Sequence, residues 1–188
     1  MVKSKSDFFH VPKTAGVSIS KALYGRPLGH FYAVNVRMVL PKTFASTFTF
    51  GISRHPVDRL YSAYRFARAG STDEMAIRNP RQYQIKEFNT FDNFVCEWLV
   101  NQNLKRIDGV FRPQHFYLCR GKNVIVDRVF RYEEINELEN VLSSVLDKDI
   151  DIGHSNVSPI YDSKVIDKKT IQVIQEVYHL DYVIFGYV

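Results

Sequence analysis

The segment His10–Ser18, near the start of the chain, combines a cation with residues suited to holding an anion. It reads His-Val-Pro-Lys-Thr-Ala-Gly-Val-Ser, with Lys13 at its centre. It lacks the Gly-x-x-x-x-Gly-Lys-Ser/Thr pattern that wraps a triphosphate. A shorter loop suffices for a 5′-phosphate that carries one further group. Taken alone, the segment fits a phosphate site and a plain strand-to-helix turn equally well.

A second candidate anion site lies in Arg54–Ser62, where an arginine and a serine stand eight positions apart. Arg54 can give a charge-assisted fork of hydrogen bonds to a phosphate. Ser62, about two helical turns later, could add a hydroxyl donor to the same group. The alternative is that Arg54 pairs with a carboxylate and Ser62 lies on an ordinary helix face.

Both segments are predicted to lie where a strand ends and a helix begins. Asp7–Val11 reads as a short buried strand and Val17–Tyr24 as a helix, with Gly25 placed to cap it. Thr47–Ile52 reads as a second strand, and Pro56 can open the helix after it. The N-terminus of a helix presents unpaired N–H groups and a dipole that favours negative charge. The first 25 residues therefore predict a phosphate site.

The rest of the chain continues to alternate strands and helices. The helix after Pro56 has a core stripe at i, i+3, i+4 and i+7, formed by Val57, Leu60, Tyr61 and Tyr64. Further on we expect a flexible polar stretch over Gly70–Asn89, a helix over Phe91–Asn101 capped by Thr90, a strand over Asn123–Phe130, helices over Glu133–Leu146 and Lys168–His179, and a terminal strand over Tyr182–Phe185. This order predicts an α/β fold whose central, mostly parallel sheet is flanked by helices. A chain of 188 residues is expected to form one domain over 1–188.

Composition favours a folded protein with an anionic partner. Apolar residues make up 45% and aromatic residues 14% of the chain, which excludes disorder. A net charge of +5 suits a phosphorylated cofactor, an acidic polysaccharide, a membrane surface or nucleic acid. No zinc-finger or RNA-recognition signature is present, so nucleic acid is not expected. Cys96 and Cys119 lack the density of a disulfide scaffold and the CxxC spacing, so two reduced, partly buried thiols are expected.

Taken together, these motifs resemble the sulfotransferases that use 3′-phosphoadenosine 5′-phosphosulfate (PAPS). The resemblance is strongest to the carbohydrate type, which includes heparan and dermatan 2-O-sulfotransferases and many bacterial relatives. Phe9–Ser18 is similar to the family's 5′-phosphosulfate loop and Arg54–Ser62 to its 3′-phosphate motif. Less sharply defined family blocks match at Phe111–Leu118, Phe130–Glu134, His154–Ser158 and Tyr178–Tyr187. Ala15 stands where many members have glycine, and the interval before Thr47 is shorter than in the animal enzymes.

The resemblance implies a P-loop-like sulfotransferase fold and in-line transfer of a sulfuryl group to a hydroxyl, which leaves 3′-phosphoadenosine 5′-phosphate (PAP). Lys13 is then expected to neutralise charge on the bridging oxygen, while the loop holds the 5′-phosphosulfate and Arg54 and Ser62 bind the 3′-phosphate. The implied cofactor-binding set is Lys13, Thr14, Ala15, Gly16, Val17, Ser18, Arg54 and Ser62. No acidic metal site is evident, so no metal ion is expected.

The acceptor hydroxyl needs a base, and histidine has a suitable ordinary pKa of about 6.5. His30, in Gly29-His-Phe-Tyr-Ala33, is our candidate because its place between the two motifs is similar to that of the base-bearing Gly-His segment in 2-O-sulfotransferases. His115 is the second candidate, and His10 is expected to order the loop. Tyr132 fits a place near the cofactor or an ordinary core position.

An acidic acceptor could be bound by Arg112, Gln114 and His115, with Arg120 as a further candidate; the alternative is that these are ordinary polar residues. An oligosaccharide is the favoured acceptor, while a glycolipid, a small alcohol or a tyrosine peptide stays open. A kinase-like phosphate-loop enzyme is disfavoured because the Walker pattern is absent. A non-catalytic module that binds a nucleotide or an anionic glycan is the other alternative.

The ends and the hydropathy of the chain bear on its location. The start, Met-Val-Lys-Ser-Lys-Ser-Asp-Phe-Phe, is too short and polar for a signal peptide, and no apolar run approaches about 18 residues. We therefore expect no stable membrane insertion. The expected location is cytoplasmic if the chain is complete and the Golgi lumen if it is an excised catalytic domain.

Overall fold

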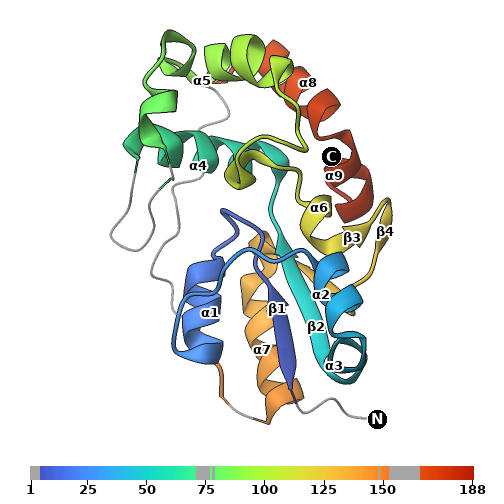
Figure 1. Cartoon of the computed structure of the whole chain (residues 1–188). Helices are drawn as coiled ribbons and strands as arrows, with labels where there is room; N and C mark the ends of the chain where they lie inside the picture. Colours follow the sequence, from blue (N-terminus) through green and yellow to red (C-terminus); the bar gives the residue numbers. More distant parts are fainter. Residues whose placement is uncertain (1–4, 71–76, 78, 148, 153–165) are drawn as a thin grey trace.

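The computed structural model describes residues 5–70, 77, 79–147, 149–152 and 166–188. Its central sheet has three parallel strands in the order β1–β2–β5 (Figure 1). These strands are β1 (Ser6–Phe9), β2 (Phe48–Ser53) and β5 (Arg128–Arg131). A parallel sheet with helices between its strands confirms the predicted α/β class. The assignment of 1–188 to one domain stays a prediction.

Helices connect and cover the strands in the described part of the chain. The α-helices are α1 (Gly16–Tyr24), α2 (Ala33–Val39), α3 (Pro41–Ser46), α4 (Pro56–Ala69), α5 (Phe91–Asn93), α6 (His115–Leu118), α7 (Ile135–Leu146), α8 (Lys168–Val177) and α9 (His179–Phe185). Short 3₁₀ turns are η1 (Pro80–Tyr83), η2 (Lys86–Phe88), η4 (Leu99–Asn101), η5 (Gly109–Phe111) and η6 (Tyr132–Glu134), and η3 (Phe94–Trp98) is a π-helical turn. A small antiparallel hairpin pairs β3 (Cys119–Arg120) with β4 (Asn123–Val124).

One face of the sheet carries Phe8, Phe50 and Phe130 and is covered by α1 and α7 (Figure 1). Phe8 lies opposite Phe50 in the strand register, and their ring centroids are 5.1 Å apart. Ile19 of α1 and Leu138 of α7 are fully buried against these rings. This packing fixes α1, and therefore the loop before it, against the end of β1.

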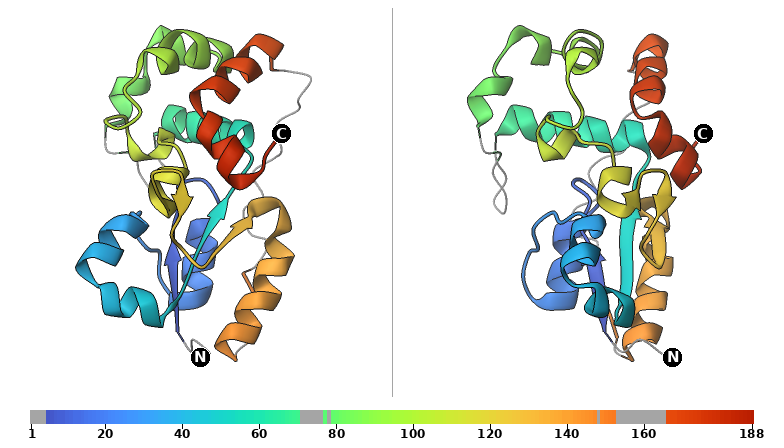
Figure 2. Two further views of the ribbon diagram at one scale, coloured as in Figure 1. Left: turned by 90° about the vertical axis from the view of Figure 1, so that its right-hand side faces the viewer. Right: turned by 45° about the vertical axis from the view of Figure 1, so that its right-hand side comes forward.

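The opposite face carries Phe9 and Gly51 and packs against α3, α6 and α9 (Figure 2). Phe44, Leu118 and Phe185 are the buried residues that these helices contribute. A Cβ atom on Gly51 would lie 2.3 Å from Cδ2 of Leu118, so the glycine lets α6 close on β2. The sheet therefore has helices on both faces.

A third, aromatic core lies beyond the carboxyl end of β2, where α4 packs beside the α5 segment and α8 (Figure 1). Ring centroids of Phe94 lie 4.9 Å from Phe88 and 5.3 Å from Phe111. Val57, Leu60 and Tyr64 of the predicted stripe on α4 are buried there, and Tyr61 packs at its edge. This core holds α4 against the end of the sheet.

The predicted terminal strand over Tyr182–Phe185 is wrong, because these residues belong to helix α9. Tyr178, Asp181, Tyr182 and Phe185 are buried, whereas Val183 is 63% exposed. Burial at i, i+3, i+4 and i+7 follows the helical period, which the apolar run Tyr182–Phe185 hid.

Two other expectations need correction. Within the supposed flexible stretch, residues 79–89 form two 3₁₀ turns whose Tyr83 and Phe88 are buried in the aromatic core; 71–76 and 78 lie outside the described residues. The strand over Asn123–Phe130 divides between the β3–β4 hairpin and β5.

The predicted caps are confirmed. The N–H of Gly25 donates to Lys21 O at 2.8 Å, and Thr90 Oγ1 accepts from the N–H of Asn93 at 3.1 Å. Cys96 and Cys119 are free thiols.

Candidate active site

The carboxyl ends of the three parallel strands meet at one edge of the sheet. His10 follows β1, Arg54 follows β2 and Tyr132 follows β5 directly. In open α/β sheets, ligands bind outside the carboxyl ends of the strands. The two anion motifs of the sequence therefore converge at the edge where such a site is expected.

The β1–α1 loop is shaped to present backbone N–H groups. Lys13 has φ 70° and Ala15 has φ 62°, both in the left-handed region. Ala15 is the N-cap of α1, and within the described part of the chain no side chain caps that terminus. Alternating left-handed residues before a helix form a concavity of N–H groups that binds anions. Thr14 is fully buried and donates its hydroxyl to Val11 O at 2.9 Å, which closes the loop on itself.

Gly16 is required because the ring of His10 lies on it. A Cβ atom there would lie 1.8 Å from His10 Cδ2, a distance that no side chain allows. The buried His10 ring also contacts Leu28 O through Nδ1 at 3.2 Å. Burial, with His30 as the second cause, lowers the pKa of His10 to about 3. A neutral His10 therefore fixes the start of α1 by packing.

Cations surround this loop. Arg54 is 4% exposed; its Nη1 donates to Lys13 O at 3.4 Å, and its Cζ lies 4.4 Å from the ring centroid of Tyr132. Lys13 Nζ lies 4.6 Å from the ring centroid of Phe66. Burial first, then the charges of Arg54 and Arg65, lower the pKa of Lys13 to about 8. Among the described residues, no ion pair joins these three cations to a carboxylate, so an anionic ligand would relieve their mutual repulsion.

Arg65 was not identified from the sequence. It lies on α4 three positions after Ser62, and its charge acts on Lys13. Residues at i and i+3 share a helix face, so this spacing was a signal that could have found it. Ser62 itself is 8% exposed on α4.

A buried network holds the main chain of Arg54. Its N–H donates to Gln114 Oε1 at 2.9 Å, and Gln114 Nε2 donates back to Arg54 O at 2.8 Å. Asp181 accepts from the N–H of Gln114 at 2.8 Å and of His115 at 2.9 Å. Gln114 and Asp181 have no exposed surface. The amide of Gln114 is thus occupied by Arg54, which favours a positioning role over contact with an acceptor.

Residues 7–188 match the model of a family described as the Sulfotransferase family. The chain belongs to this family. No curated protein and no solved structure matches the chain. Membership identifies an enzyme that transfers a sulfuryl group, and such enzymes generally use PAPS. It argues against the kinase-like and non-catalytic alternatives. Of the family blocks noted in the sequence, His154–Ser158 lies outside the described residues.

In this sulfotransferase, His30 lies against the start of the β1–α1 loop. Its Nδ1 is 3.0 Å from His10 O, and the two histidine rings are 4.2 Å apart. A carbonyl only accepts, so Nδ1 carries the proton and Nε2 of neutral His30 keeps its lone pair. Burial, opposed by the bond to His10 O and aided by Lys13, lowers the pKa of His30. The neutral form that a base requires is therefore favoured.

Arg112 lies on the same side as His30. It donates from Nε to Ile107 O at 2.8 Å and from Nη1 to the hydroxyl of Tyr32. The Tyr32 ring stacks on Tyr117 at 4.9 Å, and the Tyr117 ring is 6.4 Å from that of His30. Half-buried Arg112 is thus joined to the candidate base through two tyrosines. Arg120, in contrast, is exposed on the β3–β4 hairpin.

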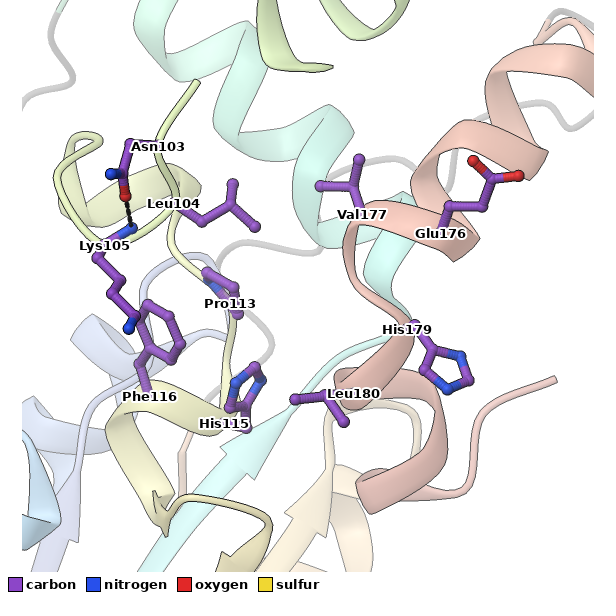
Figure 3. A pocket seen from close by; sticks show the side chains of 10 residues that line it. All are labelled: Asn103, Leu104, Lys105, Pro113, His115, Phe116, Glu176, Val177, His179 and Leu180. Carbon is purple, nitrogen blue, oxygen red and sulfur yellow. Dashed lines mark hydrogen bonds between the residues drawn. The ribbon is translucent and has the colours of Figure 1, made fainter. Parts of the chain in front are cut away.

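His115 faces a different part of the enzyme. It lines a cavity of about 470 Å³ between α6 and the α8–α9 pair (Figure 3). Figure 3 shows its ring between Pro113 and Leu180, and Nδ1 lies 2.7 Å from Asp181 Oδ1. The structure therefore places the three predicted acceptor residues in different surroundings: Arg112 is linked to His30 through two tyrosines, Gln114 bonds the main chain of Arg54, and His115 borders this cavity.

Proposed function

We propose that this sulfotransferase moves a sulfuryl group from PAPS to a hydroxyl of a carbohydrate. The observation that carries the proposal is the meeting of Lys13, Arg54 and Arg65 at the strand ends, with no carboxylate paired to them in the described residues. Two anionic groups of one ligand fit this arrangement: a 5′-phosphosulfate on the loop and a 3′-phosphate at Arg54.

PAPS supplies an activated sulfuryl group and PAP as the leaving group. The N–H groups from Thr14 to Ser18 bind the 5′-phosphosulfate, and Lys13 neutralises the charge that grows on the bridging oxygen. Because the hydroxyl of Thr14 is donated to Val11 O, Thr14 contributes its N–H. The set Ala15, Gly16 and Val17 contributes backbone only, and half-buried Ser18 adds a hydroxyl. No cluster of three or more metal-ligating side chains occurs among the residues described.

Arg54 and Ser62 bind the 3′-phosphate, and Arg65 adds charge at the same face of α4. The ring of Tyr132 lies against the guanidinium and orients its fork, while Gln114 fixes the main chain behind it. This division of labour predicts that the 3′-phosphate, rather than the adenosine, discriminates the donor from AMP.

The test compares PAP with AMP in thermal unfolding. PAP should stabilise the protein much more than AMP or ATP with Mg²⁺, because only PAP offers the 3′-phosphate. Arg54→Gln should weaken PAP binding about 10-fold or more and leave AMP unchanged. Gln114 bonds only the main chain of Arg54, so this variant keeps the buried network. Equal shifts for PAP and AMP in the wild type would remove the 3′-phosphate assignment.

His30 is proposed as the base that takes the acceptor proton at Nε2. His30→Ala should lower turnover of labelled sulfate about 10²-fold with PAP affinity intact, whereas exposed His179→Ala should not. In the wild type, the rise of kcat/KM with pH should have its midpoint below the ordinary histidine pKa of about 6.5, because burial lowers the pKa of His30. The value of kcat/KM should fall again above about pH 8 as Lys13 loses its proton. Unchanged turnover in His30→Ala would exclude it as the base.

For the acceptor, Arg112, which is linked to His30 through Tyr32 and Tyr117, supports an anionic sugar. This is the same oligosaccharide class that the sequence favoured.

A further inference from the structure

A corner of the enzyme is unusually apolar for a surface. Met38 and Val39 at the end of α2 are each 76% exposed, Leu40 is 52% exposed and Phe31 is 61% exposed. We call Phe31 and Met38–Leu40 the apolar corner. Met38–Leu40 lie where α2 meets α3, at the outer edge of the molecule (Figure 2), and Phe31 lies just before the start of α2. Ala33 and Phe44 of the same helices are buried, so the corner is held by the core.

The concentration of these side chains is what requires explanation. Other exposed large apolar residues in the described part of the chain are spread over distant elements: Tyr24, Ile85, Val100, Val124, Val183 and Val188. Single exposed apolar residues are normal on soluble proteins, whereas the three consecutive exposed residues Met38, Val39 and Leu40 are the kind of grouping that marks a binding surface.

The segment that carries the apolar corner is positively charged, which favours an anionic partner. Residues 8–57 contain no aspartate or glutamate and six basic residues, while the rest of the chain has nineteen basic and twenty acidic residues. The whole positive excess of the protein therefore comes from this segment. Two of its basic residues, Arg37 and Lys42, are exposed and flank Met38–Leu40.

Exposed apolar side chains flanked in the chain by exposed cations, as Met38–Leu40 are by Arg37 and Lys42, fit an anionic lipid surface. Symmetric pairing with a second copy would place Arg37 and Lys42 against their own copies, with no acid on this segment to offset the repulsion. A sulfated or carboxylated polysaccharide would satisfy the cations and leave the exposed methionine, valine and leucine in water.

We propose that the apolar corner docks this enzyme on an anionic lipid bilayer. Met38, Val39 and Leu40 enter the headgroup region, and Arg37 and Lys42 contact lipid phosphates. The proposed contact is peripheral, made by side chains at the surface. None of the helices in the described residues is long and apolar enough to span a membrane. Phe31 follows His30 in the chain, so docking would bring the candidate base to the lipid surface; only this last step rests on the proposed function.

The test is co-sedimentation with vesicles. The wild type should bind vesicles of phosphatidylcholine with phosphatidylglycerol, bind pure phosphatidylcholine vesicles at least about 10-fold more weakly, and lose affinity as salt rises. Met38→Ser/Val39→Ser/Leu40→Ser should lower binding to anionic vesicles about 10-fold or more. Arg37→Gln/Lys42→Gln should lower it by a similar factor. The matched control Val124→Ser/Val183→Ser removes exposed valines elsewhere and should bind as the wild type does.

Thermal unfolding and the PAP shift, measured on each variant, establish that it is folded. Equal binding of the triple-serine variant and the wild type to anionic vesicles would overturn the proposal. The proposal would also be overturned if the wild type bound no vesicles. In that case, a dimer that light scattering detects in the wild type and not in the triple-serine variant would assign the corner to self-association. Vesicle binding needs neither donor nor acceptor, so its failure is distinct from failure of the PAP test.

Discussion

In our proposal, the two strand-to-helix junctions bind one ligand by opposite means. At the β1–α1 junction the backbone is the binding group, and Lys13 and Ala15 are held in the left-handed region to aim their N–H groups. Each such non-glycine residue costs on the order of 1 kcal/mol. At the β2–α4 junction a regular strand meets a helix opened by Pro56, and the side chain of Arg54 is the binding group. The first junction stores strain, whereas the second relies on support from elsewhere in the chain.

The two junctions therefore differ in which residues bear the free-energy cost of forming the site. At the first junction the cost is electrostatic, because the Lys13 ammonium is buried close to the charges of Arg54 and Arg65. These causes lower the pKa of Lys13 to about 8. The second junction depends on Gln114 and Asp181, which touch no ligand in our proposal. Loss of Lys13 at the first junction should therefore lower turnover without lowering stability, and changes behind the second junction should lower stability.

Lys13→Ala should have the largest effect of the three changes. The effect should be a loss of turnover without a loss of folding. Without the ammonium, charge on the bridging oxygen is not neutralised, so kcat should fall about 10²–10³-fold. Labelled sulfate transfer measures it, with Lys86→Ala, a lysine whose side chain is 83% exposed, as the matched control. A loss of folding in place of a loss of turnover would contradict the comparison.

Asp181→Asn should act through stability. The buried carboxylate accepts from two N–H groups and His115, and an amide can accept with only one of its atoms. We expect a loss of about 2–4 kcal/mol in the free energy of unfolding, measured by urea denaturation. The same change at exposed Asp149 should be close to neutral. If Asp181→Asn left stability intact and abolished turnover, Asp181 would belong to the chemistry.

The same contrast explains what the sequence could predict. The first junction is local: strand, loop, helix and Gly25 cap follow one another, so their pattern is readable in order. The need for Gly16 is only partly visible, because it arises from the ring of His10 folding back on it. The support of Arg54 was not predictable, since Gln114 and Asp181 are separated by 67 positions and meet only in the folded chain. The strand predicted over Tyr182–Phe185 was wrong for a local reason, because this short apolar run hides the helical period of α9, whose buried Asp181 lies just before it.

Lys13→Met should give the smallest effect, a change in the free energy of unfolding. The change should be a gain in stability, opposite in sign to the loss expected for Asp181→Asn behind the second junction. The pKa of Lys13 is about 8 in the folded protein and about 10.5 when unfolded, so between these values the unfolded chain binds more protons and the lysine's cost to stability shrinks as pH rises. Below pH 8 the full cost is present, and Lys13→Met should be more stable than the wild type by roughly 1–3 kcal/mol. The difference in stability between the two proteins should become smaller toward pH 10. Thermal unfolding of both proteins in parallel measures it, because the contributions of all other titrating groups then cancel. PAP should also narrow this difference at pH 7, because it should stabilise the wild type, which keeps the Lys13 charge, more than Lys13→Met. A wild type more stable than Lys13→Met at pH 7 without ligand would show that the first junction is not strained by its charge.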